Sequence, residues 1–329
     1  MFPMKVFINK VIPQAGLNLL REAGIEITMW EDERTLSREE ALDFCLQHDA
    51  FLNVSQNGVD ADFLEKCQHL KVIALHSVGF DNVDVEAATR LRIPIGNTPG
   101  VLNKATAEIA LLLMLTVSRK ALHLHKKIAE GAWGISRPIM DLGIDLNGKT
   151  LGIVGLGRIG AELARMCQLA LGMNIIYHNR GTNLEAEREL GARRVEFDEL
   201  LAGSDVVSVH TALTDQTRGL FGMEQFRKMK QSAIFINTAR GAIHKEKELI
   251  QALEEGIIWG AGLDVTDPEP AHKDNPLLNM ENAVVFPHIG SATEETRGAM
   301  SRLAAENIIA GLKGERLPYP VNPEVYNKK

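Results

Sequence analysis

Three side chains that could carry acid–base or anion-binding chemistry occur in the last third of the chain. Each follows an apolar segment: Arg240 follows 233–237, Glu269 follows 260–264, and His288 follows 283–287. The carboxyl ends of parallel strands meet at one edge of a sheet, where ligands bind, so we expect these side chains to lie together. Singly, each is more typical of a surface ion pair, a loop carboxylate or a structural histidine. Together, they favour a site.

This combination suits the reduction of a 2-oxo acid, which needs a hydride on carbon and a proton on oxygen. His288 is the natural proton donor, because histidine changes its protonation state near neutral pH. Glu269 beside the ring would orient it and stabilise its protonated form. Arg240 could bind a substrate carboxylate and polarise the carbonyl, and Asp264 could accept a hydrogen bond from a nicotinamide carboxamide. The hydride would come from a cofactor.

A glycine-rich loop supplies the motif for such a cofactor. Residues 155–160 read G-L-G-R-I-G, directly after the apolar segment 150–154 and before a helical pattern over 161–171. In this context Gly155 would permit a tight turn, Gly157 would let a pyrophosphate approach the backbone, and Gly160 would allow close helix–strand packing. The helix N-terminus favours the pyrophosphate charge. The loop therefore predicts dinucleotide binding.

The end of the next predicted strand bears on which dinucleotide is used. Proteins that bind NAD usually have an acidic residue there for the ribose hydroxyls, whereas this chain reads His178-Asn179-Arg180. A carboxylate would repel a 2′-phosphate, and Arg180 could pair with one. The sequence favours NADPH. NADH use stays open, because Arg180 would equally suit a solvated loop.

Strand-like and helical segments alternate along the chain and must position these residues. The predicted strands are 5–8, 25–29, 50–53 and 72–75, then 151–154, 175–178, 206–210, 233–237, 260–264 and 283–287. One long helix is predicted over 105–127, an irregular stretch over 131–145, and a final helix over 292–312. The alternation predicts two successive α/β units whose parallel sheets are covered on both faces.

Composition excludes several other classes of protein. The chain has 329 residues, with 36 Lys and Arg against 43 Asp and Glu, a net charge of −7. The acidic balance argues against a nucleic-acid surface and a polybasic membrane anchor. Three cysteines are too few and too scattered for a disulfide framework or a zinc site. With no signal-peptide pattern and no apolar run of membrane length, we expect a cytoplasmic protein without metal, membrane or nucleic-acid partners.

Several motifs occur together in an order that identifies a family. They are H-S-V-G-F-D-N-V-D from residue 76, N-T-P-G-V-L from 97, A-T-A-E from 105, the loop at 155–160, N-T-A-R-G from 237, G-L-D-V from 262, P-E-P from 268 and P-H-I-G-S-A-T from 287. From about residue 4 to residue 322, the chain resembles the NAD(P)-dependent D-2-hydroxyacid dehydrogenases. It is nearest to the glyoxylate/hydroxypyruvate reductase branch.

The resemblance implies an architecture and a set of roles. It implies an α/β fold of two doubly wound parallel-sheet domains: a flavodoxin-like substrate domain of residues 1–99 and 290–329, and a Rossmann cofactor domain of residues 100–289. An arm at about 105–145 would join a homodimer. Arg240, Glu269 and His288 would be catalytic, and the backbone N–H groups of Val78 and Gly79 would bind the substrate carboxylate with Arg240. The expected cofactor contacts are Thr106, Gly155, Leu156, Gly157, Arg158, Ile159, Gly160, Asn179, Arg180, Ala212, Thr238, Asp264 and Gly290.

The sequence leaves open two other functions, a reductase with a different substrate and a binding protein that is not an enzyme. A 2-ketogluconate reductase would look similar and would differ in pocket room, which loops near 53–56 and 135–140 would set. Related formate dehydrogenases carry Gln where Glu269 stands, so Glu269 argues against formate oxidation. A dinucleotide-sensing co-repressor of the C-terminal-binding type resembles the same fold. The absence of long disordered extensions argues against that last reading.

Overall fold

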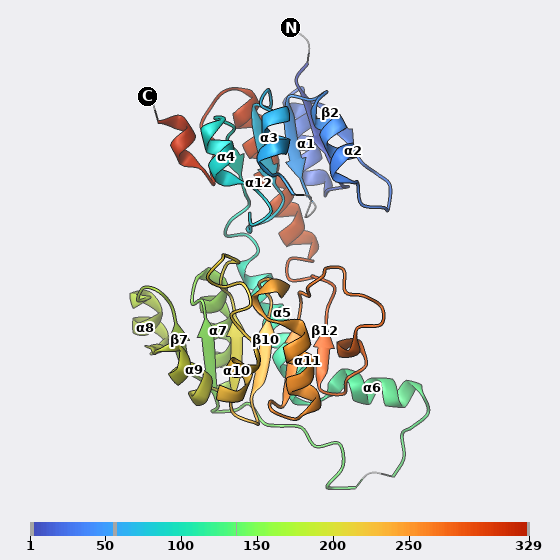
Figure 1. The fold of residues 1–329 in the computed structure, drawn as a ribbon, viewed down its shortest axis with the longest axis vertical. Coiled ribbons are helices and arrows are strands. Elements are labelled where there is room, and N and C mark those ends of the chain that lie inside the picture. The colour runs from blue at the N-terminus through green and yellow to red at the C-terminus, as the bar shows by residue number, and fades with distance from the viewer. Residues whose placement is uncertain (1–2, 55–57, 136, 328–329) are drawn as a thin grey trace. The chain divides into compact units, whose positions relative to one another are not determined.

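The computed structural model describes residues 3–54, 58–135 and 137–327 and divides into two compact units. The first unit comprises Met1–Leu102 and Ala292–Lys329, and the second comprises Asn103–Ser291. Each unit contains one parallel β-sheet with helices on both faces (Figure 1). The predicted fold class, two doubly wound α/β domains, is confirmed.

The first unit contains a five-stranded sheet. Its strands are β1 (Lys5–Ile8), β2 (Glu26–Met29), β3 (Ala50–Asn53), β4 (Val72–Leu75) and β5 (Ile95–Gly96), in the spatial order β2-β1-β3-β4-β5. That order is the flavodoxin-like one. Every residue of β3 and β4 is buried, as expected for strands covered on both faces.

Two separate apolar layers cover this sheet. One face packs against α1 (Gln14–Glu22) and α12 (Glu294–Leu312). The other packs against α2 (Arg38–Cys45), α3 (Ala61–Lys66) and α4 (Val85–Arg90). Because α12 comes from the end of the sequence, residues far apart in the chain complete this unit. The Gly16 amide of α1, for example, donates to Ser301 Oγ of α12 at 3.1 Å.

The second unit contains a seven-stranded sheet. Its strands are β6 (Thr150–Val154), β7 (Asn174–His178), β8 (Arg193–Arg194), β9 (Val206–Val209), β10 (Ile234–Asn237), β11 (Gly260–Leu263) and β12 (Ala283–Val285). The spatial order is β12-β11-β10-β9-β6-β7-β8. The order reverses between β6 and β9, the switch point at which a Rossmann fold binds its dinucleotide.

Helices cover both faces of this second sheet. One face packs against α5 (Asn103–Ser118), α7 (Arg158–Leu171) and α8 (Leu184–Leu190). The other packs against α9 (Phe197–Gly203), α10 (Met223–Lys228) and α11 (Glu246–Glu254). The central strands β9, β10 and β11 are fully buried between these layers, whereas both residues of the edge strand β8 are exposed.

The predicted single helix over 105–127 is wrong. The chain forms α5 and then α6 (Ala121–Ala129), with a break at Lys120, which has a left-handed φ of 50°. The Lys120 Nζ atom pairs with Glu281 Oε1 at 2.7 Å and lies over the Trp259 ring, and these contacts hold the break. Periodicity could not reveal a single left-handed residue inside an otherwise helical pattern.

Two short strands were also missed by the sequence prediction. They are β5 and β8, and each has only two residues. Strands this short carry no measurable alternation of polar and apolar residues, so pairing with a neighbouring strand alone defines them. β8 matters for the site, because it places Arg194 opposite Tyr177 of β7.

Cys45, Cys67 and Cys167 are unpaired and buried, and burial raises the pKa of the Cys167 thiol to about 12. Within the part of the chain that the structure describes, no helix combines the length and the apolar character needed to cross a membrane.

Candidate active site

The predicted acid and histidine meet at the carboxyl edge of the second sheet. Glu269 lies in the loop after β11 and His288 lies in the loop after β12. His288 Nδ1 is 2.5 Å from Glu269 Oε1. The two side chains are 37% and 23% exposed. An ionised carboxylate can only accept, so Nδ1 donates and Nε2 is left to act on a ligand.

A buried carboxylate holds the turn that presents the histidine. His288 has a left-handed φ of 53°, which only surrounding contacts can sustain. Asp264 is 1% exposed, and its two oxygens accept from the Ile289 and Gly290 amides at 2.8 and 2.7 Å. Burial raises the pKa of Asp264. The predicted contact of Asp264 with a carboxamide stays a prediction, whereas its hold on the His288 turn is visible.

Thr106 and Gly290, both predicted as cofactor contacts, are joined at the same turn. The Thr106 hydroxyl of α5 donates to the Gly290 carbonyl at 3.1 Å. A Cβ at Gly290 would lie 3.0 Å from Asp264 Oδ2 and 3.3 Å from Thr106 Cγ2. A side chain here would crowd Asp264 and Thr106, and the Thr106–Gly290 hydrogen bond helps to fix the loop that follows His288.

Arg240 is presented by a turn after β10 that a single asparagine organises. Asn237 accepts from the Ala239 amide at 2.9 Å, and its Nδ2 donates to the Arg240 carbonyl at 2.9 Å. The same Nδ2 lies 3.1 Å from Nδ1 of His244, which is 2% exposed. Burial lowers the pKa of His244 to about 4, so its ring is neutral and can accept this hydrogen bond. His244 is a supporting residue that sequence reasoning missed.

Thr238, another predicted cofactor contact, lies in the same turn. It is 8% exposed, and its hydroxyl oxygen is buried without a hydrogen-bond partner among the residues that the structure describes. Buried hydroxyls are normally satisfied, so an unsatisfied one at the carboxyl end of a strand indicates a place for a ligand. Arg240 itself is half-buried, and its Nη1 donates to the Ala239 carbonyl at 2.7 Å.

The glycine loop has the geometry that its motif predicts. Gly155 has a φ of 96°, and a Cβ there would lie 2.7 Å from the Thr211 amide nitrogen. At Gly157, the N-cap of α7, a Cβ would meet nothing within 4 Å. At Gly160 it would lie 2.9 Å from the Gly155 carbonyl oxygen. Gly155 and Gly160 are thus required by packing, while the space at Gly157 is open to a ligand.

Two asparagines bind the middle of this loop. Asn179 Oδ1 accepts from the Leu156 amide at 2.7 Å, and its Nδ2 donates to the Leu156 carbonyl at 3.2 Å. Asn183 Nδ2 donates to the same carbonyl at 3.0 Å. The backbone amide and carbonyl of Leu156 therefore both have hydrogen-bond partners in the Asn179 side chain.

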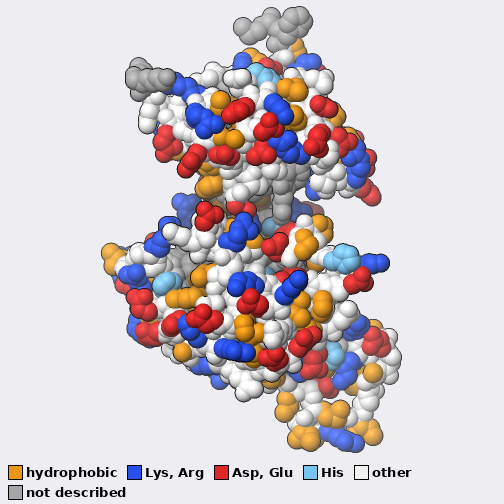
Figure 2. All heavy atoms as spheres, viewed as in Figure 1, with side chains coloured by type: hydrophobic (Ala, Val, Ile, Leu, Met, Phe, Trp, Pro, Cys, Tyr) orange, Lys and Arg blue, Asp and Glu red, His pale blue; other side chains and the backbone are white. Residues whose placement is uncertain are grey.

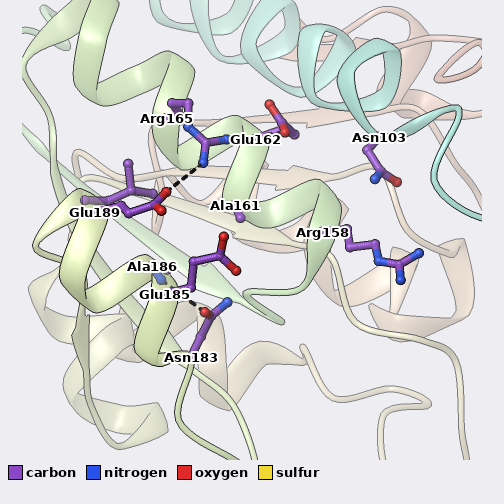
Figure 3. A pocket seen from close by; sticks show the side chains of 10 residues that line it. Asn103, Arg158, Ala161, Glu162, Arg165, Asn183, Glu185, Ala186 and Glu189 are labelled. Atoms are coloured by element: carbon purple, nitrogen blue, oxygen red, sulfur yellow. Dashed lines mark hydrogen bonds and ion pairs between the residues drawn. The ribbon is translucent and has the colours of Figure 1, made fainter.

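The first amides of α7 remain for an anion. The helix's first backbone bond is donated by Ala161 to Gly157. The preceding amides of Arg158, Ile159 and Gly160 thus have no partner within the helix. Figure 3 shows a pocket that Arg158, Arg165 and Glu189 all line, with the Arg158 side chain pointing away from the Arg165–Glu189 ion pair.

The carboxyl ends of β7 and β9 lie at the same edge of the second sheet as the glycine loop. His178 Nδ1 lies 3.0 Å from the Val195 carbonyl oxygen, so the ring is turned toward the protein rather than toward a ribose. Arg180 is exposed in the turn that follows. Beyond β9, Ala212 lies in an exposed turn, and its carbonyl accepts from Thr217 Oγ1 at 2.8 Å.

In the first unit, the predicted backbone site follows β4. Ser77 Oγ donates to the Gly79 carbonyl at 2.7 Å, and Asn97 Nδ2 donates to the Val78 carbonyl at 2.9 Å. These bonds fix the turn through its carbonyls and leave the amides of Val78 and Gly79 for an anion. The loops expected to set pocket room include residues 55–57 and 136, which lie outside the described residues.

The second unit fits a dinucleotide on structural grounds. It offers an open glycine position at Gly157 and an exposed cation at Arg180. Within the described ranges it also offers three amides at the start of α7 and a buried Thr238 hydroxyl that have no hydrogen-bond partner. Each is complementary to a phosphate or to a polar group of such a ligand.

Comparisons with known proteins agree with this geometry. Residues 111–290 match the family model described as the D-isomer specific 2-hydroxyacid dehydrogenase, NAD binding domain. A glyoxylate reductase from Thermococcus litoralis is 44% identical over 325 residues, covering 98% of this chain and 97% of that protein. A glyoxylate reductase structure from Paecilomyes thermophila superposes with a TM-score of 0.85 at 38% identity, covering 98% and 99% of the two chains.

A second solved structure holds a bound cofactor. It is an NADPH-dependent glyoxylate/hydroxypyruvate reductase from Sinorhizobium meliloti in complex with NADP and malonate. It superposes with a TM-score of 0.86 at 27% identity and covers 100% of this chain and 99% of its own.

Proposed function

Because the chain belongs to the D-isomer specific 2-hydroxyacid dehydrogenases, we propose that it reduces a small 2-oxo acid, glyoxylate or hydroxypyruvate, to the D-2-hydroxy acid. The observation that carries the proposal is the His288–Glu269 pair at the carboxyl edge of the Rossmann sheet. The full-length similarity to glyoxylate reductases supports the choice of substrate.

The hydride and the proton of the proposed reaction come from different groups. The bound nicotinamide supplies the hydride. His288, protonated and held through Nδ1 by Glu269, donates the Nε2 proton to the carbonyl oxygen as the alcohol forms. Glu269 accepts the hydrogen bond from Nδ1 and thereby fixes the orientation of the ring. In the reverse direction the neutral ring accepts the same proton.

The substrate is oriented by its carboxylate. Arg240 offers a planar guanidinium that can pair with two carboxylate oxygens and place a positive charge near the carbonyl. The amides of Val78 and Gly79 are proposed to bind the same carboxylate from the substrate-binding unit. That unit is proposed to be the first one, Met1–Leu102 with Ala292–Lys329, and the cofactor-binding unit the second, Asn103–Ser291. The bounds expected from the sequence, 1–99 with 290–329 and 100–289, differ from these by two or three residues.

We assign a preference for NADPH over NADH, with NADH as a second cofactor. Arg180 is exposed at the end of β7, and the segment 178–180 contains no carboxylate that would repel a 2′-phosphate. The pyrophosphate is expected on the α7 amides of Arg158 and Ile159 beside Gly157. The proposed nicotinamide contacts are Thr106, Thr238, Asp264 and Gly290, and Ala212 is proposed on the adenosine side.

The proposed assembly is a homodimer joined through α6 and the arm that follows it. α6 has no buried residue, and Trp133, Ile135 and Ile139 are 78%, 86% and 82% exposed. Hydrophobic side chains gather on this projecting arm (Figure 2). An apolar surface of this kind is costly in water and is typical of a subunit interface. Sedimentation at several concentrations tests the assembly, and a monomer at all of them would reject it.

A cytoplasmic location is also part of the proposal. Three unpaired, buried thiols suit a reducing compartment, in which disulfides do not form. Fractionation of cells that express the chain with a small tag tests the location.

One steady-state experiment tests the function and its nearest alternative. NADH and NADPH are each combined with glyoxylate, hydroxypyruvate, pyruvate and 2-ketogluconate, and kcat/KM is measured for every pair. The highest value is expected for NADPH with glyoxylate or hydroxypyruvate. A higher value with 2-ketogluconate would move the substrate to the sugar acids, and a higher value with NADH would reject the cofactor preference. Tight cofactor binding without turnover of any acid would favour a dinucleotide sensor.

A further inference from the structure

The edge strand β8 carries two adjacent arginines with different surroundings. Arg193 Nη1 pairs with Glu199 Oε1 at 2.7 Å, so its charge is neutralised within the protein. Arg194 forms no ion pair with any residue that the structure describes. It is opposite Tyr177 of β7, one residue before the strand end where an adenosine ribose is expected.

The Arg194 guanidinium covers the end of β7. Its Nε and Nη2 atoms donate to the Asn179 carbonyl at 3.2 and 3.0 Å, and Nη2 also donates to the Arg180 carbonyl at 3.2 Å. These bonds occupy one side of the guanidinium fork and leave Nη1, an exposed donor, without a partner in the described chain. The positive charge of Arg194 is therefore not balanced by a carboxylate of the described chain, and its Nη1 group lies beside the backbone of Arg180 without a partner there.

The turn that carries Arg180 is fixed at several other points. The Asn183 amide donates to the Tyr177 hydroxyl at 2.9 Å, and the Asn179 and Asn183 side chains both bind Leu156 of the glycine loop. The Tyr177 hydroxyl in turn donates a hydrogen bond to Glu187 Oε1 at 2.8 Å, so the Glu187 carboxylate is bound to Tyr177. Arg180 therefore extends from a turn whose backbone is ordered without any ligand.

We propose that Arg194 is a second cation for the 2′-phosphate of NADPH and a determinant of cofactor specificity alongside Arg180. This inference rests on the proposed NADPH preference and adds a residue that the strand-end motif does not contain. Two guanidinia at the end of one strand would suit a dianionic phosphate better than one. By holding the Asn179 and Arg180 carbonyls, Arg194 also keeps the turn in its binding form, which lowers the entropy lost on binding.

The experiment compares two nucleotide fragments of the cofactor that differ only in the 2′-phosphate. Binding of adenosine 2′,5′-bisphosphate and of 5′-AMP to the full chain is measured by calorimetry for the wild type, Arg194→Gln and Arg194→Lys. We expect Arg194→Gln to weaken bisphosphate binding about tenfold and 5′-AMP binding less than twofold, since one charge-assisted contact is lost. Arg194→Lys should retain part of the affinity. The loss should shrink at high salt, where charge interactions are screened.

Arg193→Gln is the matched control. It removes the same charge from the adjacent position of the same strand, but from an arginine already paired with Glu199. Both fragments should bind this variant as they bind the wild type. The ratio of kcat/KM for NADPH to that for NADH should fall about tenfold in Arg194→Gln and stay constant in Arg193→Gln.

The outcomes separate this inference from the proposal on which it rests. If the wild type binds the two fragments equally, the NADPH preference fails, and the role of Arg194 fails with it. If the wild type prefers the bisphosphate but Arg194→Gln keeps that preference, only the inference about Arg194 is overturned. An equal loss for both fragments would make Arg194 a structural residue of the turn and would also overturn it.

Discussion

The two units use the same kind of sheet but present different chemistry at it. The first unit follows β4 with a half-buried turn whose carbonyls accept hydrogen bonds from Ser77 and Asn97. In the second unit, Arg240 follows β10, Glu269 follows β11 and His288 follows β12. These residues present charged or titratable side chains instead of backbone amides. Backbone amides bind an anion without titrating, whereas a proton transfer needs a group that changes its charge. Binding and proton transfer can thus be divided between two similar folds.

The supports of the two turns differ in the same way. In the second unit a buried carboxylate, Asp264, holds the left-handed turn at His288, and a buried neutral histidine, His244, supports the turn at Arg240 through Asn237. In the first unit the supports are a hydroxyl and an amide. We therefore expect substitutions in the second unit to have larger effects and to depend more on pH.

The largest effect is expected for His288→Ala. The variant lacks the proton donor, so kcat for reduction should fall about 1000-fold while cofactor affinity stays within about twofold. Steady-state kinetics and fluorescence titration measure the two quantities. His272→Ala, which removes an exposed histidine from the Glu269 loop, should behave as the wild type. Retained kcat in His288→Ala would show that the proton comes from elsewhere.

Arg240→Lys should come next. Lysine keeps the charge but loses the planar fork that pairs with a carboxylate, so kcat/KM for the 2-oxo acid should fall about 100-fold. Arg227→Lys, on the exposed surface of α10, is the control and should change nothing. An unchanged kcat/KM in Arg240→Lys would remove Arg240 from substrate binding.

Buried His244 should make the second unit sensitive to acid. Burial lowers its pKa to about 4 in the folded chain, below the usual 6.5 of the unfolded one. Between these values only the unfolded state binds the proton, so the free energy of unfolding falls as pH decreases from 6.5 to 4. The loss should reach up to about 3 kcal/mol.

Urea unfolding at several pH values measures this loss. His244→Gln lacks the titrating ring, so its free energy of unfolding should fall less than that of the wild type over the same window. Parallel pH profiles for the two proteins would contradict the assignment.

The smallest effect is expected in the first unit, for Asn97→Ala. Loss of one hydrogen bond to the Val78 carbonyl should loosen the amide turn and raise KM for the 2-oxo acid about fivefold, with little change in kcat. Asn147→Ala, an exposed asparagine in the second unit, is the control. A large drop in kcat with constant KM would mean that the turn contributes to the chemical step, which would remove the contrast between the two units.

Much of this organisation could be predicted from the sequence. The parallel sheets follow from alternating strand-like and helical segments. The meeting of Glu269 and His288 follows from their positions after two successive strands. The glycine loop could be predicted because its motif has local causes: packing leaves no room for a side chain at 155 and 160, and position 157 borders open space. These features are local, so a short stretch of chain contains all the information they need.

Tertiary structure alone decided the rest. The break at Lys120 depends on its contact with the distant Glu281. The two-residue strand β8 and the contacts of His244 and Arg194 depend on how segments of the second unit pack together. Arg193 and Arg194 are chemically identical in the sequence, yet one is neutralised by Glu199 and the other covers the end of β7. The sequence by itself determined which chemical groups are available and which elements they follow. Which groups are paired, buried or free depended on packing, because a charge acquires its role only from the atoms around it.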